Sequence, residues 1–134
     1  MIDFGVSKQL KSLYTYPRTF TVIGTPHYMA PEIIQGKGYS FFVDLWSIGV
    51  CLFEFSCGNL PFGNDDDDPY LIYQEIIKNK YVINGKCTEI KARNMINQLL
   101  NKIPESRLGG SYAALKANAF FDGINWVRIF SFHF

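Results

Sequence analysis

The run Phe42–Cys57 is the feature that most constrains how this chain can fold. In a helical arrangement its apolar side chains cover nearly every side, and Gly58 follows directly. A helix that is apolar all round is buried in protein, and glycine is common just past a helix end. Asp44 and Glu54 interrupt the wider apolar stretch 41–62, so its uncharged part is far shorter than the roughly 20 residues of a bilayer span. The run therefore predicts a central buried helix and no membrane span.

The composition indicates one globular domain without a polyanionic partner. The chain has 134 residues, of which 48% are hydrophobic and 16% aromatic. Thirteen Lys and Arg residues oppose twelve Asp and Glu residues, which gives a formal net charge of +1. Because nucleic-acid binders carry a marked basic excess, we expect no nucleic-acid partner.

The cysteines and the first residues indicate a cytoplasmic protein. Cys51, Cys57 and Cys87 form neither an even disulfide framework nor a metal-ligand spacing, so we expect reduced thiols and no structural metal. The N-terminus lacks the basic and then apolar pattern of a secretory signal.

Apolar spacing and capping signals predict several further helices and almost no strand. Helices are expected from Pro31 to just before Gly36, from Pro69 with Asp68 as its cap, from near Thr88 to Leu100, and over Ser111–Phe121. The segment Ser12–Thr25 lacks apolar periodicity, which indicates an extended surface loop. We therefore predict a mainly α fold.

Five short motifs occur in the order in which protein kinases carry them. Asp-Phe-Gly at 3–5 and Ala-Pro-Glu at 30–32 bracket a loop that ends in GTPHYMAPE. DLWSIGV at 44–50, LPFG at 60–63 and SRLGG at 106–110 follow. Together they resemble the activation segment and the C-terminal lobe of a protein kinase domain. The resemblance implies a partial, protein-kinase-like C-terminal lobe, in which the activation segment precedes a helical subdomain.

Within the protein kinases, longer runs resemble one subgroup. GTPHYMAPE, GKGYSFFVDLWSIGVCLFEFSCGNLPFGND and FFDGINW are similar to the cGMP-dependent kinases of protists, which belong to the AGC group with the cAMP-dependent enzymes. By this resemblance, residues 1–126 are a partial kinase domain, with the activation segment at 3–32 and the helical lobe at 33–126. Residues 127–134 depart from the family and form a divergent end.

The resemblance implies a fragment of a serine/threonine kinase that transfers the γ-phosphate of ATP to basic protein substrates. MgATP is the implied cofactor, and Asp3 is the implied catalytic residue that binds magnesium and so holds the nucleotide. Regulation by cGMP would require domains that these residues do not supply. The glycine-rich loop, strand lysine and catalytic-loop base of the family belong before Asp3, so we expect the isolated chain to be inactive and to need the remainder of the kinase domain. A non-catalytic interaction module and a truncated gene product without activity are the alternatives.

The resemblance also assigns an activation-loop phosphorylation site. Thr21, in RTFTVIGTP, occupies the place of the phosphothreonine, and Lys8 the place of a cationic partner for its phosphate. A phosphate adds nearly two negative charges and can order such a loop. Thr19 is the competing acceptor.

Substrate-binding roles fall on the end of the loop and on the apolar helix. By resemblance, Thr25 positions the acceptor hydroxyl, while Val22, Pro26 and Met29 line the pocket for the substrate residue after it. Glu54 matches an acid that pairs with arginine in basic substrates. Since a carboxylate in an apolar helix is costly unless paired, a purely structural pairing of Glu54 is equally open.

The resemblance further predicts a buried ion pair between Glu32 and Arg107. It would tie the activation segment to the last helices, and loss of either partner would leave a stranded charge.

Overall fold

The computed structural model describes residues 4–10, 18–65, 67–110 and 112–130, and in these it is mostly helical. The elements in chain order are η1 (Pro26–Tyr28), α1 (Pro31–Ile34), α2 (Phe42–Cys57), α3 (Pro69–Lys78), α4 (Ile90–Leu99), η2 (Pro104–Gly110), α5 (Tyr112–Lys116), η3 (Ala119–Phe121) and α6 (Trp126–Phe130). Within the described ranges the extended pairing is limited to one isolated antiparallel bridge, between Thr19 and Tyr39. The prediction of a mainly α fold is confirmed.

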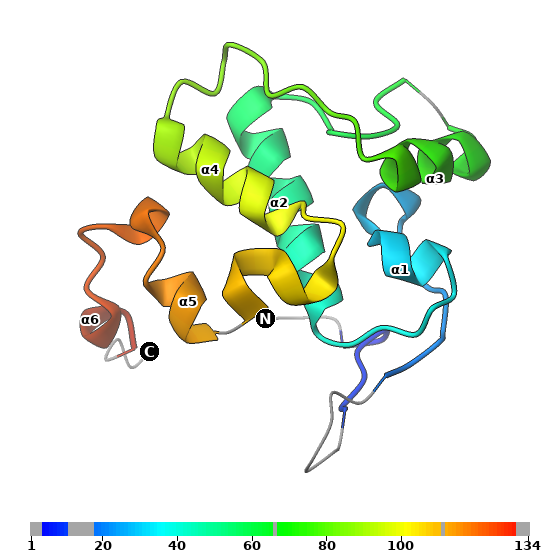
Figure 1. Cartoon of the computed structure of the whole chain (residues 1–134), viewed down its shortest axis with the longest axis horizontal. Coiled ribbons are helices and arrows are strands. Elements are labelled where there is room, and N and C mark those ends of the chain that lie inside the picture. Colours follow the sequence, from blue (N-terminus) through cyan, green and yellow to red (C-terminus); the bar gives the residue numbers. More distant parts are fainter. Residues whose placement is uncertain (1–3, 11–17, 66, 111, 131–134) are drawn as a thin grey trace.

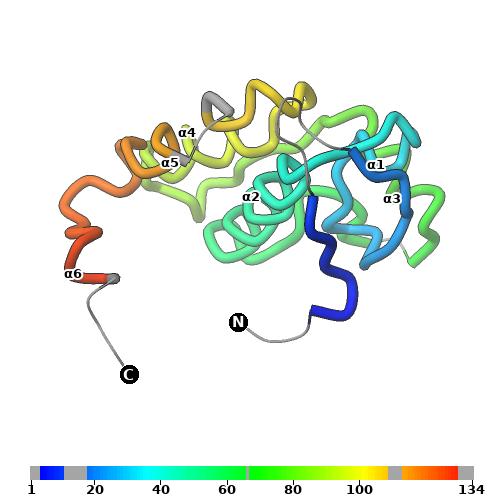
Figure 2. The backbone as a smooth tube through the Cα atoms, turned by 90° about the horizontal axis from the view of Figure 1, so that it is seen from below, coloured from blue at the N-terminus to red at the C-terminus, as the bar shows by residue number. Residues whose placement is uncertain are grey.

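Helix α2 is the central element, and its bounds agree with the apolar run in the sequence. It packs along α4 and against η2, while α1 and α3 lie beyond one of its ends (Figure 1). Seen from below, α4 and α5 lie on one side of α2 and the N-terminal segment (blue) on the other (Figure 2). Gly58 ends the helix with a φ of 77°, which residues with a side chain rarely adopt.

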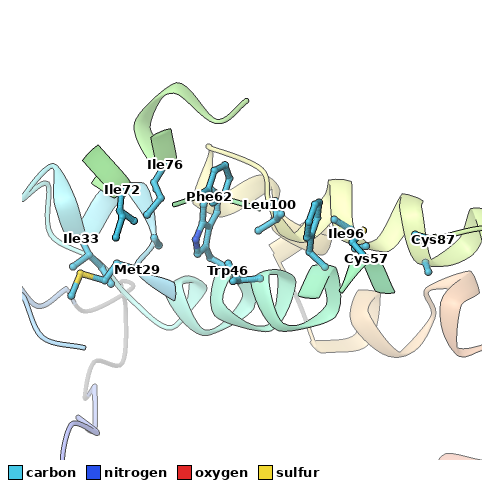
Figure 3. Close-up of a cluster of buried hydrophobic side chains, with 14 residues drawn as sticks. Met29, Ile33, Trp46, Cys57, Phe62, Ile72, Ile76, Cys87, Ile96 and Leu100 are labelled. Carbon is cyan, nitrogen blue, oxygen red and sulfur yellow. The ribbon is translucent and has the colours of Figure 1, made fainter. Parts of the chain in front are cut away.

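The main core fills the space between α2 and the helices α3 and α4 (Figure 3). Trp46, Val50 and Phe53 of α2 are at most 1% exposed, and the Trp46 ring stacks on Phe62 at 5.7 Å between centroids. Met29 of the loop end belongs to the same cluster. The end of the loop is therefore anchored in the core of the helical lobe.

Helix α3 begins as its sequence predicts. The Asp68 carboxylate accepts a hydrogen bond from the Tyr70 backbone N–H at 2.9 Å, and Pro69 occupies the first turn. Proline suits this position because its missing N–H would have had no partner there. The helix ends at Asn79, which has a φ of 53°.

The prediction of one helix over Ser111–Phe121 is wrong, because the structure divides this region into α5 and η3. Asn118 adopts an extended conformation, and its side-chain oxygen accepts from the Phe120 backbone N–H at 3.0 Å. Asparagine competes with helical backbone bonding in this way and favours a cap.

Three further expectations concern a membrane span, the thiols and the surface loop. Among the described residues, none of the helices meets the length and hydropathy that a bilayer span requires. All three cysteines are free. The expected loop 12–25 is described from Arg18 onward, and its earlier residues lie outside the described ranges.

Candidate functional site

The described part of the loop is fixed to the segment before α2 by the bridge at Thr19. The backbone N–H of Thr19 donates to the Tyr39 carbonyl, and that of Tyr39 donates to the Thr19 carbonyl, each at 2.8 Å. Thr19 is 5% exposed, and its hydroxyl oxygen accepts a hydrogen bond from Lys8 Nζ at 2.9 Å. Lys8 therefore contacts the loop at Thr19, two residues before Thr21.

Thr21 itself lies on the surface. Its residue is exposed, and its backbone carbonyl accepts a hydrogen bond from the Tyr39 hydroxyl. The loop offers the Thr21 hydroxyl to solvent, whereas the Thr19 hydroxyl is buried and occupied.

Thr25 caps the short helix η1 with an extended backbone, while its side chain makes no capping bond and the residue is exposed. Val22 is 58% exposed, Pro26 is half-buried and Met29 is 5% exposed. The Met29 methyl would lie 4.0 Å from a Cβ added at Gly24, so it reaches back beneath the loop. The three apolar residues assigned to the substrate pocket therefore form a gradient from surface to core.

Glu54 is held by the loop. Tyr28 Oη donates to Glu54 Oε2 at 3.0 Å, and Ser47 Oγ donates to the Tyr28 carbonyl at 3.0 Å. The hydrogen bond to the carboxylate raises the pKa of Tyr28, with burial adding to the effect. Glu54 remains half-buried, so part of its carboxylate faces solvent next to the η1 segment.

The loop end is also tied to the LPFG turn. His27 Nε2 lies 3.2 Å from the Gly63 carbonyl, and the Gly63 N–H donates to Glu75 Oε2 at 2.7 Å. Gly63 has a φ of 63°, and a Cβ there would lie 2.6 Å from Ile72 Cγ1. The turn thus approaches α3 closely and contacts η1 through His27.

Arg107 and Glu32 form a buried two-pronged ion pair. Arg107 Nη1 lies 2.7 Å from Glu32 Oε1, and Nη2 lies 2.8 Å from Oε2. Arg107 also donates to the carbonyls of Phe42 and Asn101 and lies over the Trp46 ring, 5.1 Å from its centroid. Arg107 therefore joins α1, the start of α2 and the turn after α4.

The described site differs in two ways from the site that the sequence predicts. Asp3 lies outside the described residues. Tyr28 and Ser47, which hold Glu54 in place, were not singled out by sequence reasoning, and no periodicity or motif links a loop tyrosine to a carboxylate on α2.

The comparisons with known proteins define the class of this molecule. The family model described as "Protein kinase domain" matches residues 1–121. The chain belongs to the protein kinase domain family.

Individual relatives narrow the resemblance. The chain is 44% identical to a cGMP-dependent protein kinase of Eimeria tenella and 42% identical to one of Plasmodium berghei, in each case over 132 residues and 96% of the chain. It is 37% identical to a cAMP-dependent protein kinase catalytic subunit of Dictyostelium discoideum over 96% of the chain. The chain spans 13%, 15% and 19% of the lengths of these three relatives.

Proposed function

We propose that this chain forms the substrate-binding side of a serine/threonine protein kinase that transfers the γ-phosphate of ATP to basic protein substrates. The observation that carries the proposal is the position of Glu54, because Tyr28 holds its partly exposed carboxylate beside the loop that bears Thr25. A carboxylate fixed in this way can pair with a substrate arginine. Thr25, whose side chain is not used for capping, would position the acceptor hydroxyl, and Val22, Pro26 and Met29 would line the adjoining pocket.

MgATP is the proposed cofactor, and Asp3 is the proposed metal ligand. A carboxylate is the ligand type that magnesium prefers, and the ion would bridge the phosphates and neutralise their charge. The cGMP-dependent relatives suggest cGMP as a regulator that acts through a domain these residues do not form. The three free thiols fit the reducing environment of the cytoplasm, which we propose as the location.

We further propose that the remainder of a kinase domain covers the open face of α2, which Asp44, Ile48 and Phe55 define. A helical period places these three side chains on one side of the helix. Ile48 is 49% and Phe55 84% exposed. Burial raises the pKa of Asp44, and its carboxylate has no hydrogen bond or ion pair with any residue the structure describes. An apolar face with a partnerless, partly desolvated acid fits a protein interface.

A chimera tests the kinase proposal. The chain would replace the matching 132 residues of the Eimeria tenella enzyme, and we expect the product to phosphorylate a serine peptide with arginines before the serine. Glu54→Gln keeps an oxygen for Tyr28 but removes the charge, so kcat/KM for this peptide should fall roughly 10- to 100-fold, mainly through KM.

Glu89→Gln provides the matched control, because Glu89 is an exposed acid at the start of α4 and should leave kcat/KM unchanged. A chimera that has the melting temperature of the Eimeria tenella enzyme but transfers no phosphate would contradict the proposed activity. It would favour a non-catalytic interaction module. Equal effects of the two substitutions would leave Glu54 with a structural role.

Phosphorylation of the loop gives a separate prediction. In the same chimera supplied with MgATP, we expect phosphate on Thr21, since its hydroxyl is exposed while that of Thr19 is buried and bonded to Lys8. Peptide mass spectrometry should find the modified loop peptide in Thr19→Val and should not find it in Thr21→Val. Phosphate retained in Thr21→Val would reject the assignment of Thr21, and its loss in Thr19→Val would then assign the site to Thr19.

A further inference from the structure

A pocket outside the substrate-binding region collects positive charge from three separate segments. It has a volume of about 440 Å³ and lies between α1, the segment before α2, the end of α3 and the turn after α4. Arg18 from the loop, Lys37 from the turn after α1, and Lys102 from the turn before η2 line it. None of the three forms an ion pair with another described residue.

The acids of this pocket do not cancel that charge. Glu32 faces the pocket, but its two oxygens are already bonded to Arg107. Glu105 is then the one uncompensated acid among the described lining residues, which leaves an excess of two positive charges. A phosphate monoester carries −1.5 to about −2 charges near pH 7, whereas a carboxylate carries one. The charge of the pocket therefore matches a phosphate monoester.

The backbone holds Arg18 in this position. The two hydrogen bonds between Thr19 and Tyr39 fix the chain next to Arg18. A Cβ added at Gly38 would lie 2.7 Å from the Phe20 ring and 3.4 Å from Arg18 Cδ. Gly38 thus leaves room for the Phe20 ring, and the Arg18 side chain lies beside it at ordinary van der Waals distance.

Apolar side chains complete the pocket. Phe42, Ile77 and Ile103 are among the lining residues, together with Ser40. The volume falls at the small end of the range for ligand pockets, which suits a ring or a short aliphatic group.

We propose that this pocket binds a phosphate monoester carried on a compact apolar body. Arg18, Lys37 and Lys102 bind the phosphate oxygens, and Phe42 and Ile103 contact the body. This proposal concerns a site other than the one assigned to peptide substrates, and it stands whether or not the chain takes part in phosphoryl transfer.

Titration of the 134-residue chain, followed by amide NMR shifts, tests the proposal. Phenyl phosphate should shift the amides of residues 35–40 and 101–105 and bind about tenfold or more tightly than inorganic phosphate, because its ring is buried as well. Phenol, which lacks the charge, should not saturate. A peptide with one phosphotyrosine distinguishes the source of the ligand: tighter binding than phenyl phosphate indicates a phosphorylated protein segment, and weaker binding indicates a free metabolite.

Single substitutions locate the binding. Lys37→Ala and Lys102→Ala should each weaken phenyl phosphate binding about tenfold, the usual effect of losing one charged hydrogen bond. Glu105→Gln should strengthen it. Lys86→Ala removes an exposed lysine outside the pocket and should change nothing. All four side chains are exposed, so the variants retain the fold.

Three results would each overturn the proposal: equal affinity for inorganic and phenyl phosphate, equal weakening by Lys86→Ala and Lys37→Ala, or shifts that avoid residues 35–40 and 101–105. Each would reduce the binding to a general attraction between anions and surface lysines. None of these results bears on the activity of the chimera.

Discussion

Replacing Arg107 by alanine is expected to lower the free energy of unfolding by about 3–5 kcal/mol. Arg107 is fully buried, and its removal leaves the Glu32 carboxylate without a counter-charge in the interior. The carbonyls of Phe42 and Asn101 lose their guanidinium donor at the same time. Urea unfolding, monitored by far-UV circular dichroism, measures the loss. Arg107→Lys retains the charge but not the two-pronged geometry, so its effect should be intermediate.

The chain contains a matched control for this pair. Lys91 Nζ also lies 2.7 Å from a carboxylate oxygen, that of Asp122, but these side chains are 52% and 62% exposed. Exposed pairs contribute about 0–1 kcal/mol, so Lys91→Ala should change stability little. If both alanine variants lost the same stability, burial would not be the origin of the effect at Arg107.

The contrast between these two pairs shows what the sequence can and cannot predict. The motifs name both Glu32 and Arg107, because each lies in a short run that resembles a kinase motif. Of the exposed pair, Asp122 lies in the run FFDGINW, but Lys91 lies in no such run, so no motif relates the two residues. The helices α2 and α3 are equally accessible to sequence reasoning, since an all-round apolar run and an Asp-Pro start depend on neighbouring residues alone.

The sequence predicts which residues belong to the candidate site, but it does not predict how their side chains contact one another. The resemblance names Glu54 and Thr25, yet the hydrogen bond from Tyr28 that joins their segments depends on how the loop packs on α2. The cationic pocket is harder still. Arg18, Lys37 and Lys102 come from three loops, where no helical or strand period relates one side chain to another.

The presence of glycine at position 49 is explained by packing between two helices and not by the local sequence. Replacing Gly49 by valine is expected to lower the free energy of unfolding by about 3 kcal/mol or more. The sequence shows only a glycine inside a helix, which by propensity alone is unfavourable by about 1 kcal/mol relative to alanine. In the structure a Cβ at position 49 would lie 2.7 Å from Leu99 Cβ and 2.9 Å from Leu100 Cδ2. Leu99 Cβ is attached to the α4 backbone, so relief requires the two helices to move apart.

Gly49→Ala separates the two effects, because helix propensity favours it while the contact with α4 opposes it. We expect the contact to prevail and the variant to lose about 1–2 kcal/mol in urea unfolding. Gly85→Ala is the control, since an added Cβ there has no atom within 4 Å and stability should stay equal or rise by up to about 1 kcal/mol. If Gly49→Ala were more stable than the parent chain, propensity would outweigh the contact. The close approach of α2 and α4 would then not depend on the absence of a side chain at this position.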